Sequence, residues 1–297
     1  MKTVAIIGPT ASGKTDIAHA LARKTGAAVL SCDSLSVFQT IDIASAKPSP
    51  KERAGIDYFG IDCVAPCGRF GADEFIEVFK EAKRFCQEKK RPLIIAGGTG
   101  FYLKMLTNGL SAIPPIAPDV AAEVDRLLEN PVLAHQKLLQ IDPVYGSRID
   151  PNDRYRIEKG LLIALAGEET PTGWFAKNPP KPLLESVAVF EVSWPTEALR
   201  GRIAQRTRHM LDAGLIDEVA RLEACCPRNA QAMRSIGIAE VLDYFDGKTG
   251  RKSLETLIST HTAQLAKRQR TFNRGQFDTL VSLGGAEILD RAQPLLF

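Results

Sequence analysis

Residues 8–15 read Gly8-Pro9-Thr10-Ala11-Ser12-Gly13-Lys14-Thr15, and this stretch decides the fold. It follows the apolar run 4–7 and precedes residues 16–22, whose apolar positions have helical spacing. Strand, glycine loop, Lys-Thr pair and helix are the context of a phosphate-binding P-loop. The glycines let backbone N–H groups turn towards an anion, Lys14 adds a cation, and the Thr15 hydroxyl offers a ligand for Mg²⁺. The alternative is a glycine turn that binds no ligand, but the strand before it and the helix after it would then flank it only by chance. The sequence therefore predicts a site for a di- or triphosphate.

Composition indicates an ordinary globular protein. The chain has 297 residues, of which 44% are hydrophobic and 25% charged, which is enough for one large domain or two smaller ones. The net charge of +3 is nearly balanced, so a nucleic-acid surface must be local. We find no signal peptide and no apolar run of about 18 residues. We expect a cytoplasmic monomer with no membrane partner.

The six cysteines, at positions 32, 63, 67, 86, 225 and 226, form no CxxC pair. No histidine lies near enough to complete a zinc-binding pattern. This scatter predicts free thiols in a reducing compartment.

Further apolar runs place more polar residues beside the glycine loop. We predict buried strands at 27–32 and 92–96, a short strand at 58–61, and helices at 75–89 and 101–107. Strands that alternate with helices form a doubly wound parallel sheet, in which ligands lie beyond the carboxyl ends of the strands. Residues 8–15, Asp33-Ser34 and residues 97–100 all fall at that edge.

Proline-rich segments divide the rest of the chain. Residues 113–118 read as a boundary, 119–170 as helical, and 171–182 as a turn-rich linker. A strand at 187–192 then rejoins the sheet, before helices near 196–213, 215–225, 235–246 and 253–273 and a last strand near 279–283. The predicted fold is α/β: a P-loop NTPase-like, doubly wound parallel sheet core with an inserted small helical domain. The predicted domains are a first core segment at 1–112, a helical insertion at 113–185, and a core completion with C-terminal helices at 186–297.

The acid that a hydrolytic ATPase needs is missing, because the strand at 92–96 ends in glycines and the strand at 187–192 ends in Ser193-Trp194. The acid present is Asp33, beyond the strand next to the glycine loop. A carboxylate there can accept a proton from an attacking hydroxyl or amine. Alternatively, Asp33 caps a helix or holds metal-bound water. Lys14, Thr15 and Asp33 suit group transfer from a phosphorylated donor, without distinguishing a phosphoryl group from a carbon group.

Three basic groups favour an RNA-sized substrate over a metabolite. The first contains Lys267, Arg268, Arg270 and Arg274, with no acid between Glu255 and Asp278; the second contains Arg200, Arg202, Arg206 and Arg208; the third contains Arg154, Tyr155, Arg156 and Lys159. Positions 202 and 206 share a helix face. Each group alone is also compatible with a solvated surface.

Ordered motifs from residue 4 to about 275 resemble the tRNA dimethylallyltransferases. They are residues 8–15, Asp33-Ser34, Asp42-Ile43, Ala46-Lys47-Pro48, Gly97-Gly98-Thr99, Tyr102-Leu103-Lys104, Asn152-Asp153 with Arg156, Leu199-x-x-Arg202-Ile203-x-x-Arg206, Ser235-Ile236-Gly237, and Leu265-Ala266-Lys267-Arg268-Gln269-x-Thr271-Phe272. Departures from the family pattern include Phe38 for Tyr, Ile238 for Tyr, Ala263 for Arg and Phe272 for Trp.

The resemblance implies transfer of a dimethylallyl group from its diphosphate to N6 of the adenine 3′ of the anticodon, in tRNAs that read U-initial codons. It implies that residues 10–15 hold the diphosphate with Mg²⁺, Thr10 lies beside the breaking C–O bond, Asp33 takes the N6 proton, and Arg206 steadies the leaving group. It assigns tRNA contacts to Asp33, Ser34, Leu35, Ser36, Thr99, Tyr155, Arg156, Ile157, Glu158, Lys159, Arg234, Ser235, Ile236, Gly237, Ile238, Ala239, Lys267, Arg268, Gln269, Arg270, Thr271, Phe272, Asn273 and Arg274.

Three other functions use the same motifs. A small-molecule or nucleotide kinase would bind ATP on the loop and use Asp33, but it leaves the insertion and the basic groups unexplained. An adenylate isopentenyltransferase would prenylate free AMP or ADP. A non-enzymatic RNA-binding ATPase would need the missing acid.

Overall fold

The computed structural model describes residues 1–167 and 169–297, which form two compact units. The first unit contains Met1–Thr107 and Leu184–Phe297, and the second contains Asn108–Leu183. The second unit therefore holds most of the predicted insertion, whose tRNA-binding role stays a prediction. Each unit is described by itself.

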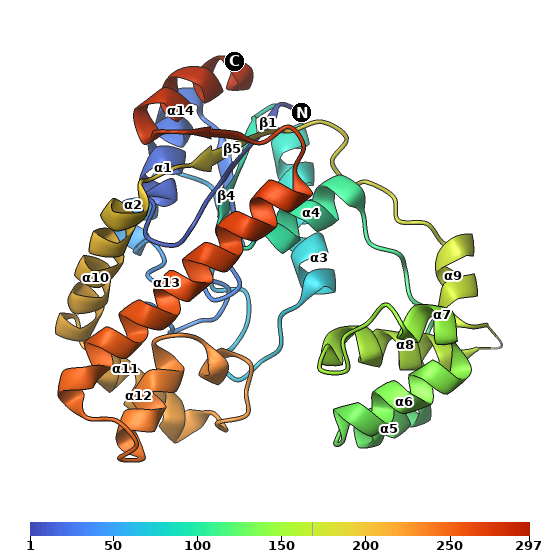
Figure 1. The fold of residues 1–297 in the computed structure, drawn as a ribbon. Coiled ribbons are helices and arrows are strands. Elements are labelled where there is room, and N and C mark those ends of the chain that lie inside the picture. The colour runs from blue at the N-terminus through green and yellow to red at the C-terminus, as the bar shows by residue number, and fades with distance from the viewer. Residues whose placement is uncertain (168) are drawn as a thin grey trace. The chain divides into compact units, whose positions relative to one another are not determined.

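The first unit is built on a six-stranded parallel sheet, as the sequence predicted (Figure 1). The strand order is β3-β2-β4-β1-β5-β6. The strands are β1 (Thr3–Ile7), β2 (Ala28–Ser31), β3 (Tyr58–Phe59), β4 (Leu93–Gly97), β5 (Ala188–Val192) and β6 (Val281–Leu283). β1 lies between β4 and β5 and is buried along its whole length, which explains its uninterrupted apolar sequence.

Helices cover both faces of this sheet. Val4 and Ile6 of β1 share one hydrophobic cluster with α1 (Lys14–Thr25) and α14 (Gly285–Ala292). On the other face, α3 (Ala72–Glu88) packs against β2, β3 and β4, and α13 (Arg251–Gln276) reaches β5 through a hydrogen bond. The remaining helices of this unit are α2 (Pro50–Arg53), α4 (Gly100–Asn108), α10 (Thr196–Asp212), α11 (Leu215–Cys225), η1 (Ala232–Arg234), α12 (Ile238–Phe245) and η2 (Gln293–Leu296).

The second unit is helical, with its own hydrophobic core around Val124, Leu138 and Leu161. Its helices are α5 (Pro118–Leu127), α6 (Pro131–Ile141), α7 (Pro143–Gly146), α8 (Arg154–Ala166) and α9 (Pro171–Lys177). The prediction of turns from 171 was wrong for α9. The Thr170 hydroxyl accepts a hydrogen bond from the Gly173 N–H, and Pro171 occupies the first helical turn, where a missing N–H costs nothing.

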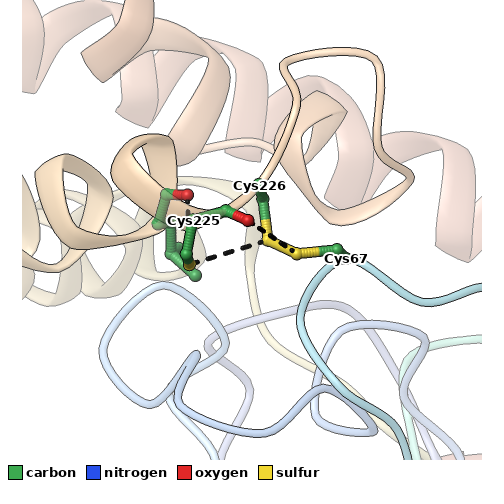
Figure 2. The surroundings of a disulfide bond; sticks show 4 residues. Cys67, Cys225 and Cys226 are labelled. Carbon is green, nitrogen blue, oxygen red and sulfur yellow. Dashed lines mark hydrogen bonds between the residues drawn. A yellow bond between two sulfur atoms is a disulfide. The ribbon is translucent and has the colours of Figure 1, made fainter.

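The prediction that all cysteines are free was also wrong. Cys67 and Cys226 form a disulfide, while Cys32, Cys63, Cys86 and Cys225 are free thiols (Figure 2). The paired cysteines are separated by 159 residues, so no local spacing could reveal the pair.

Among the described residues, no helix has the combination of length and apolar character that crossing a bilayer requires.

Candidate active site at the carboxyl edge of the sheet

The glycine loop (residues 8–15) turns tightly between β1 and α1. Gly8, Ala11 and Gly13 have φ angles of +148°, +62° and +88°. A Cβ atom on Gly8 would lie 3.2 Å from the backbone of Val192, so only glycine fits between the loop and β5. Left-handed residues in such a loop can turn neighbouring N–H groups towards an anion, and the first N–H groups of α1 have no partner within the helix. The loop therefore has the form of an anion cradle.

Side chains from three later elements hold this loop in place. Trp194 Nε1 donates to the Ser12 carbonyl at 2.9 Å, and Arg202 Nε donates to the Ala11 carbonyl at 2.7 Å. The Arg202 guanidinium lies 4.6 Å from the centre of the Trp194 ring. Gln269 of α13 accepts a hydrogen bond from the Thr10 N–H and donates one to the Gly98 carbonyl, each at 2.9 Å. Gln269 thus joins the glycine loop to the loop that follows β4.

A cavity of about 520 Å³ opens beside the glycine loop, with Thr10, Asp33 and Arg206 in its wall. Asp33 Oδ1 accepts hydrogen bonds from the N–H groups of Leu35 (2.9 Å) and Ser36 (3.2 Å). Asp33 therefore closes the turn after β2, where the alternative interpretation expected a helix cap, and it also lines the cavity. These hydrogen bonds fix its orientation there.

Three ionisable groups interact electrostatically at this edge. Burial lowers the pKa of Lys14 to about 8, an effect that the negative charge of Asp33 opposes. Burial also lowers the pKa of Arg206, and Asp33 again acts in the opposite direction. Lys14 Nζ donates to the Pro9 carbonyl at 2.6 Å, so the cation is folded onto the loop. The site thus concentrates positive charge in a poorly hydrated place, where an anion interacts with it strongly.

The lowered pKa of Lys14 predicts a pH-dependent affinity for inorganic diphosphate. Lys14 is protonated below pH 8 and loses its charge above it, so binding should weaken as the pH rises through 8. Because diphosphate itself titrates, the measurement is the ratio of wild-type to Lys14→Arg affinity by calorimetry without metal. We expect that ratio to fall about tenfold per pH unit above pH 8. A constant ratio from pH 7 to 10 would contradict this assignment.

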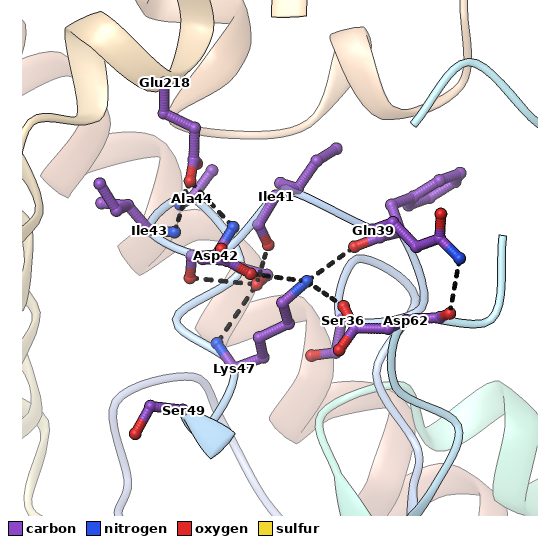
Figure 3. A network of polar contacts seen from close by, with 12 residues as sticks. Ser36, Gln39, Ile41, Asp42, Ile43, Ala44, Lys47, Ser49, Asp62 and Glu218 are labelled. Atoms are coloured by element: carbon purple, nitrogen blue, oxygen red, sulfur yellow. Dashed lines mark hydrogen bonds and ion pairs between the residues drawn. The ribbon is translucent and has the colours of Figure 1, made fainter. Parts of the chain in front are cut away.

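The segment that follows Asp33 is shaped by two buried charged side chains (Figure 3). Glu218 of α11 accepts hydrogen bonds from the N–H groups of Asp42, Ile43 and Ala44 at 2.8–2.9 Å. Lys47 contacts the Phe38 carbonyl at 2.8 Å and the Asp42 carboxylate at 2.9 Å. Ser45 directly follows the three residues that Glu218 binds, and its carbonyl accepts a hydrogen bond from Arg206 at 3.3 Å. Glu218 therefore positions a wall of the cavity without entering it.

Glu218→Gln should destabilise the protein. A glutamine presents one oxygen where the carboxylate presents two, so at least one of the three N–H groups would lose its acceptor. We expect the free energy of unfolding, measured in urea, to be about 1–3 kcal/mol lower than that of wild type. Turnover should fall as well. Arg221→Gln, an exposed residue in the middle of α11, is the control and should change neither quantity. Unchanged stability in Glu218→Gln would refute the positioning role.

The structure separates the predicted basic groups. Arg202 and Arg206 both face the site, whereas Arg200 and Arg208 are exposed and pair with Glu197 and Glu255. Lys267, Arg268 and Arg274 of α13 are exposed, and Arg268 lines the cavity. Leu35, Arg234, Ser235, Ile236 and Phe272 also line it, as do Ser34 and Thr99, whose N–H and hydroxyl are hydrogen-bonded to each other. Tyr155, Arg156, Glu158 and Lys159 lie on α8 of the second unit.

Several predicted tRNA contacts fall on buried residues and stay predictions. The side chains of Ile157, Ile238 and Asn273 are 0–1% exposed and pack inside their units, so a contact with RNA would have to use the backbone. Gly237 and Ser36 are also buried. Gln269 is engaged with the glycine loop, as described above. Ala239, Arg270 and Thr271 remain predictions.

Glu191 was missed in the sequence. This buried acid lies on β5, where it accepts hydrogen bonds from Asn273 Nδ2 at 2.9 Å and Ser282 Oγ at 3.1 Å. Its charge also counteracts the lowering of the Lys14 pKa. A charged residue within the apolar run 187–192 was the available signal.

The sequence pattern of one family, described as IPP transferase, matches residues 36–276. The chain belongs to the IPP transferase family. It is similar to the tRNA dimethylallyltransferase of Sulfurimonas denitrificans, with 49% identity over 282 residues that cover 95% of each chain. It is 45% identical to that of Wolinella succinogenes over 98% of this chain and 97% of the relative. Among solved IPP transferases, the full-length tRNA isopentenylpyrophosphate transferase of Bacillus halodurans has a TM-score of 0.73, at 26% identity over 99% of this chain and 96% of that one.

Proposed function

We propose that this protein transfers a dimethylallyl group from dimethylallyl diphosphate to N6 of the adenine 3′ of the anticodon in tRNAs that read U-initial codons. The observation that carries the proposal is the convergence of the glycine loop, Asp33 and Arg206 on one cavity. The names of the relatives support the same reaction class.

The cavity suits both parts of the donor. Its charged end can hold a diphosphate, while Met210, Ile236, Ile258, Leu265 and Phe272 supply an apolar wall for a five-carbon chain. The exposed ring of Phe101 and the ring of Phe272 offer stacking surfaces for an adenine that has left its base stack.

The reaction requires the C–O bond of the donor to break as the C–N bond forms. The electron pair of the C–O bond goes to the diphosphate oxygen, where the N–H groups of residues 13–15, the Lys14 ammonium and Arg206 stabilise the developing charge. The N6 amine supplies the electron pair of the new bond, and its proton passes to Asp33. Thr10 lies in the cavity wall beside the expected position of the breaking bond.

Mg²⁺ belongs to this proposal as a cofactor. Thr15 stands in the first turn of α1 and is partly exposed, so its hydroxyl can be one protein ligand. Such a sparse protein contribution fits Mg²⁺, which keeps several waters and is usually held by substrate phosphates. When bound, the ion would neutralise charge on the leaving diphosphate. Glu191 is not proposed as a second metal ligand, because both of its carboxylate oxygens accept hydrogen bonds from protein groups.

One assay separates this function from the alternatives. The protein is incubated with dimethylallyl diphosphate, ATP and either unmodified tRNA, AMP or ADP; the products are digested and analysed by mass, and hydrolysis of ATP is followed in the same samples. We expect N6-prenyladenosine from tRNA only. Product from free nucleotides would favour adenylate prenylation, whereas ATP turnover without prenyl transfer would favour the kinase.

The proposal also includes a cytoplasmic location and a monomeric state, and both stay predictions.

Arg268 should contribute to tRNA affinity through a backbone phosphate. It is exposed at the cavity, on a helix with no acid between Glu255 and Asp278. For Arg268→Ala we expect weaker binding, with the slope of log affinity against log salt shallower by about 0.7–0.9. Lys252→Ala, an exposed lysine at the other end of α13, is the control and should keep the wild-type slope. Equal slopes for the two variants would exclude this contact.

A further inference from the structure

Three cysteine sulfurs of the first unit meet in one cluster (Figure 2). None of the three cysteines lines the active-site cavity. Cys67 comes from the loop between β3 and α3, and Cys225 and Cys226 come from the end of α11. All three Sγ atoms lie within 4.8 Å of one another. The Cys225 and Cys226 sulfurs are 3.8 Å apart, and Cys67 Sγ lies 3.3 Å from the Cys225 carbonyl oxygen.

Local backbone geometry creates this cluster. α11 ends at Cys225, and Cys226 is extended (φ −124°, ψ 135°) because it precedes Pro227, which disfavours a helical conformation. On the other side, the Gly68 N–H donates to the Ala65 carbonyl at 2.9 Å and closes a turn around Cys67.

The two segments are also joined without the disulfide. The Gln231 side chain accepts a hydrogen bond from the Phe70 N–H at 3.0 Å and donates one to the Phe70 carbonyl at 2.8 Å. Because this pair of bonds does not involve sulfur, we expect the three cysteines to stay together after the disulfide is reduced.

We propose that the reduced form of this cluster binds a thiophilic cation of the Zn²⁺ class through Cys67, Cys225 and Cys226. Zinc–thiolate bonds of about 2.3 Å in a tetrahedral site place sulfurs about 3.8 Å apart, which the Cys225–Cys226 pair already matches. Cys67 and Cys225 are exposed, so an ion can enter and water can complete the coordination. Thiolates are also the ligands that this soft class of metal prefers.

Metal binding and the disulfide exclude each other. Two electrons from a phosphine reductant, which becomes a phosphine oxide with an oxygen from water, convert the disulfide into two thiols. The cation then displaces one proton from each of the three thiols. Oxidation of Cys67 and Cys226 would remove two of the three ligands.

The experiment uses Cd²⁺ as a spectroscopic probe for the zinc site. Full-length protein is reduced with a phosphine, desalted without oxygen, and titrated with Cd²⁺ while thiolate-to-metal charge-transfer absorption is followed. We expect saturation at one Cd²⁺ per chain, reversal by Zn²⁺, and no binding after reoxidation with diamide. Free-thiol counting before the titration verifies complete reduction.

Variants locate the ligands. Cys67→Ser, Cys225→Ser and Cys226→Ser should each lose the stoichiometric absorption, while circular dichroism verifies that they are folded. Cys63→Ser is the matched control, because Cys63 is an exposed thiol of the same loop outside the cluster, and it should bind as wild type does. Absence of the absorption in the reduced wild-type protein, or its loss in Cys63→Ser, would overturn the proposal.

Discussion

Asp33→Asn is expected to lower the turnover number for tRNA prenylation by about 10²–10⁴-fold, because the variant cannot accept the N6 proton. Asparagine retains a side-chain oxygen, so it can still accept the hydrogen bonds from Leu35 and Ser36 that shape the turn. The substitution therefore removes the charge and preserves the local backbone. Single-turnover kinetics with saturating donor and tRNA measure the effect on the transfer step.

Binding measurements distinguish loss of chemistry from loss of the site. Well below pH 8, Asp33→Asn should bind inorganic diphosphate at least as tightly as wild type, since a negative charge leaves the anion-binding cavity. The low pH matters because loss of Asp33 also removes a charge that favours protonated Lys14. Asp278→Asn, an exposed acid beyond the end of α13, should keep wild-type kinetics. A transfer rate within about threefold of wild type in Asp33→Asn would be incompatible with a general-base role.

Arg206→Gln is expected to lower turnover about 10²–10³-fold, the usual effect of removing one preorganised group that stabilises developing negative charge. Arg206 projects from α10 into the cavity wall, where Ser45 holds it by one hydrogen bond. Diphosphate affinity should fall as well, because the guanidinium is a charged donor in a poorly hydrated place.

Two further variants test whether the effect is specific to the Arg206 guanidinium. Arg206→Lys keeps the positive charge but loses the planar fork of donors, so it should recover part of the lost turnover. Arg200→Gln changes an exposed arginine of the same helix, which pairs with Glu197, and should have no effect. Equal turnover of Arg206→Gln and Arg200→Gln would remove Arg206 from the catalytic group.

The sheet was predictable because its determinants are local. Apolar runs and a glycine loop in register with a helix sufficed to assign the parallel strands and the edge at which Asp33 and residues 97–100 meet. α14 was missed although Ile288 and Ala292 pack on the α1 side of the sheet. Its short apolar pattern lies after Gly284-Gly285, and no element was predicted beyond residue 283.

The supports of the site could not be predicted, because their partners are far away in the sequence. Glu218 lies 174–176 residues from the N–H groups that it binds, and Gln269 lies 259 residues from Thr10. The resemblance placed Gln269 in one of the family motifs and assigned it to RNA. Only the folded chain shows that its amide is satisfied by two loops of the protein. The sequence also could not show that Ile238 is buried, because an apolar side chain fits both a hydrophobic core and a contact surface.

The position of β1 has a consequence for synthesis on the ribosome. One of its two neighbours, β5, is made only after the entire second unit, and the glutamine that grips Thr10 follows later still. A nascent chain can therefore display the whole glycine motif while lacking the strand and the helix that shape it. The complete form of the glycine loop therefore arises late in chain elongation, so we expect prematurely terminated products to lack the proposed activity.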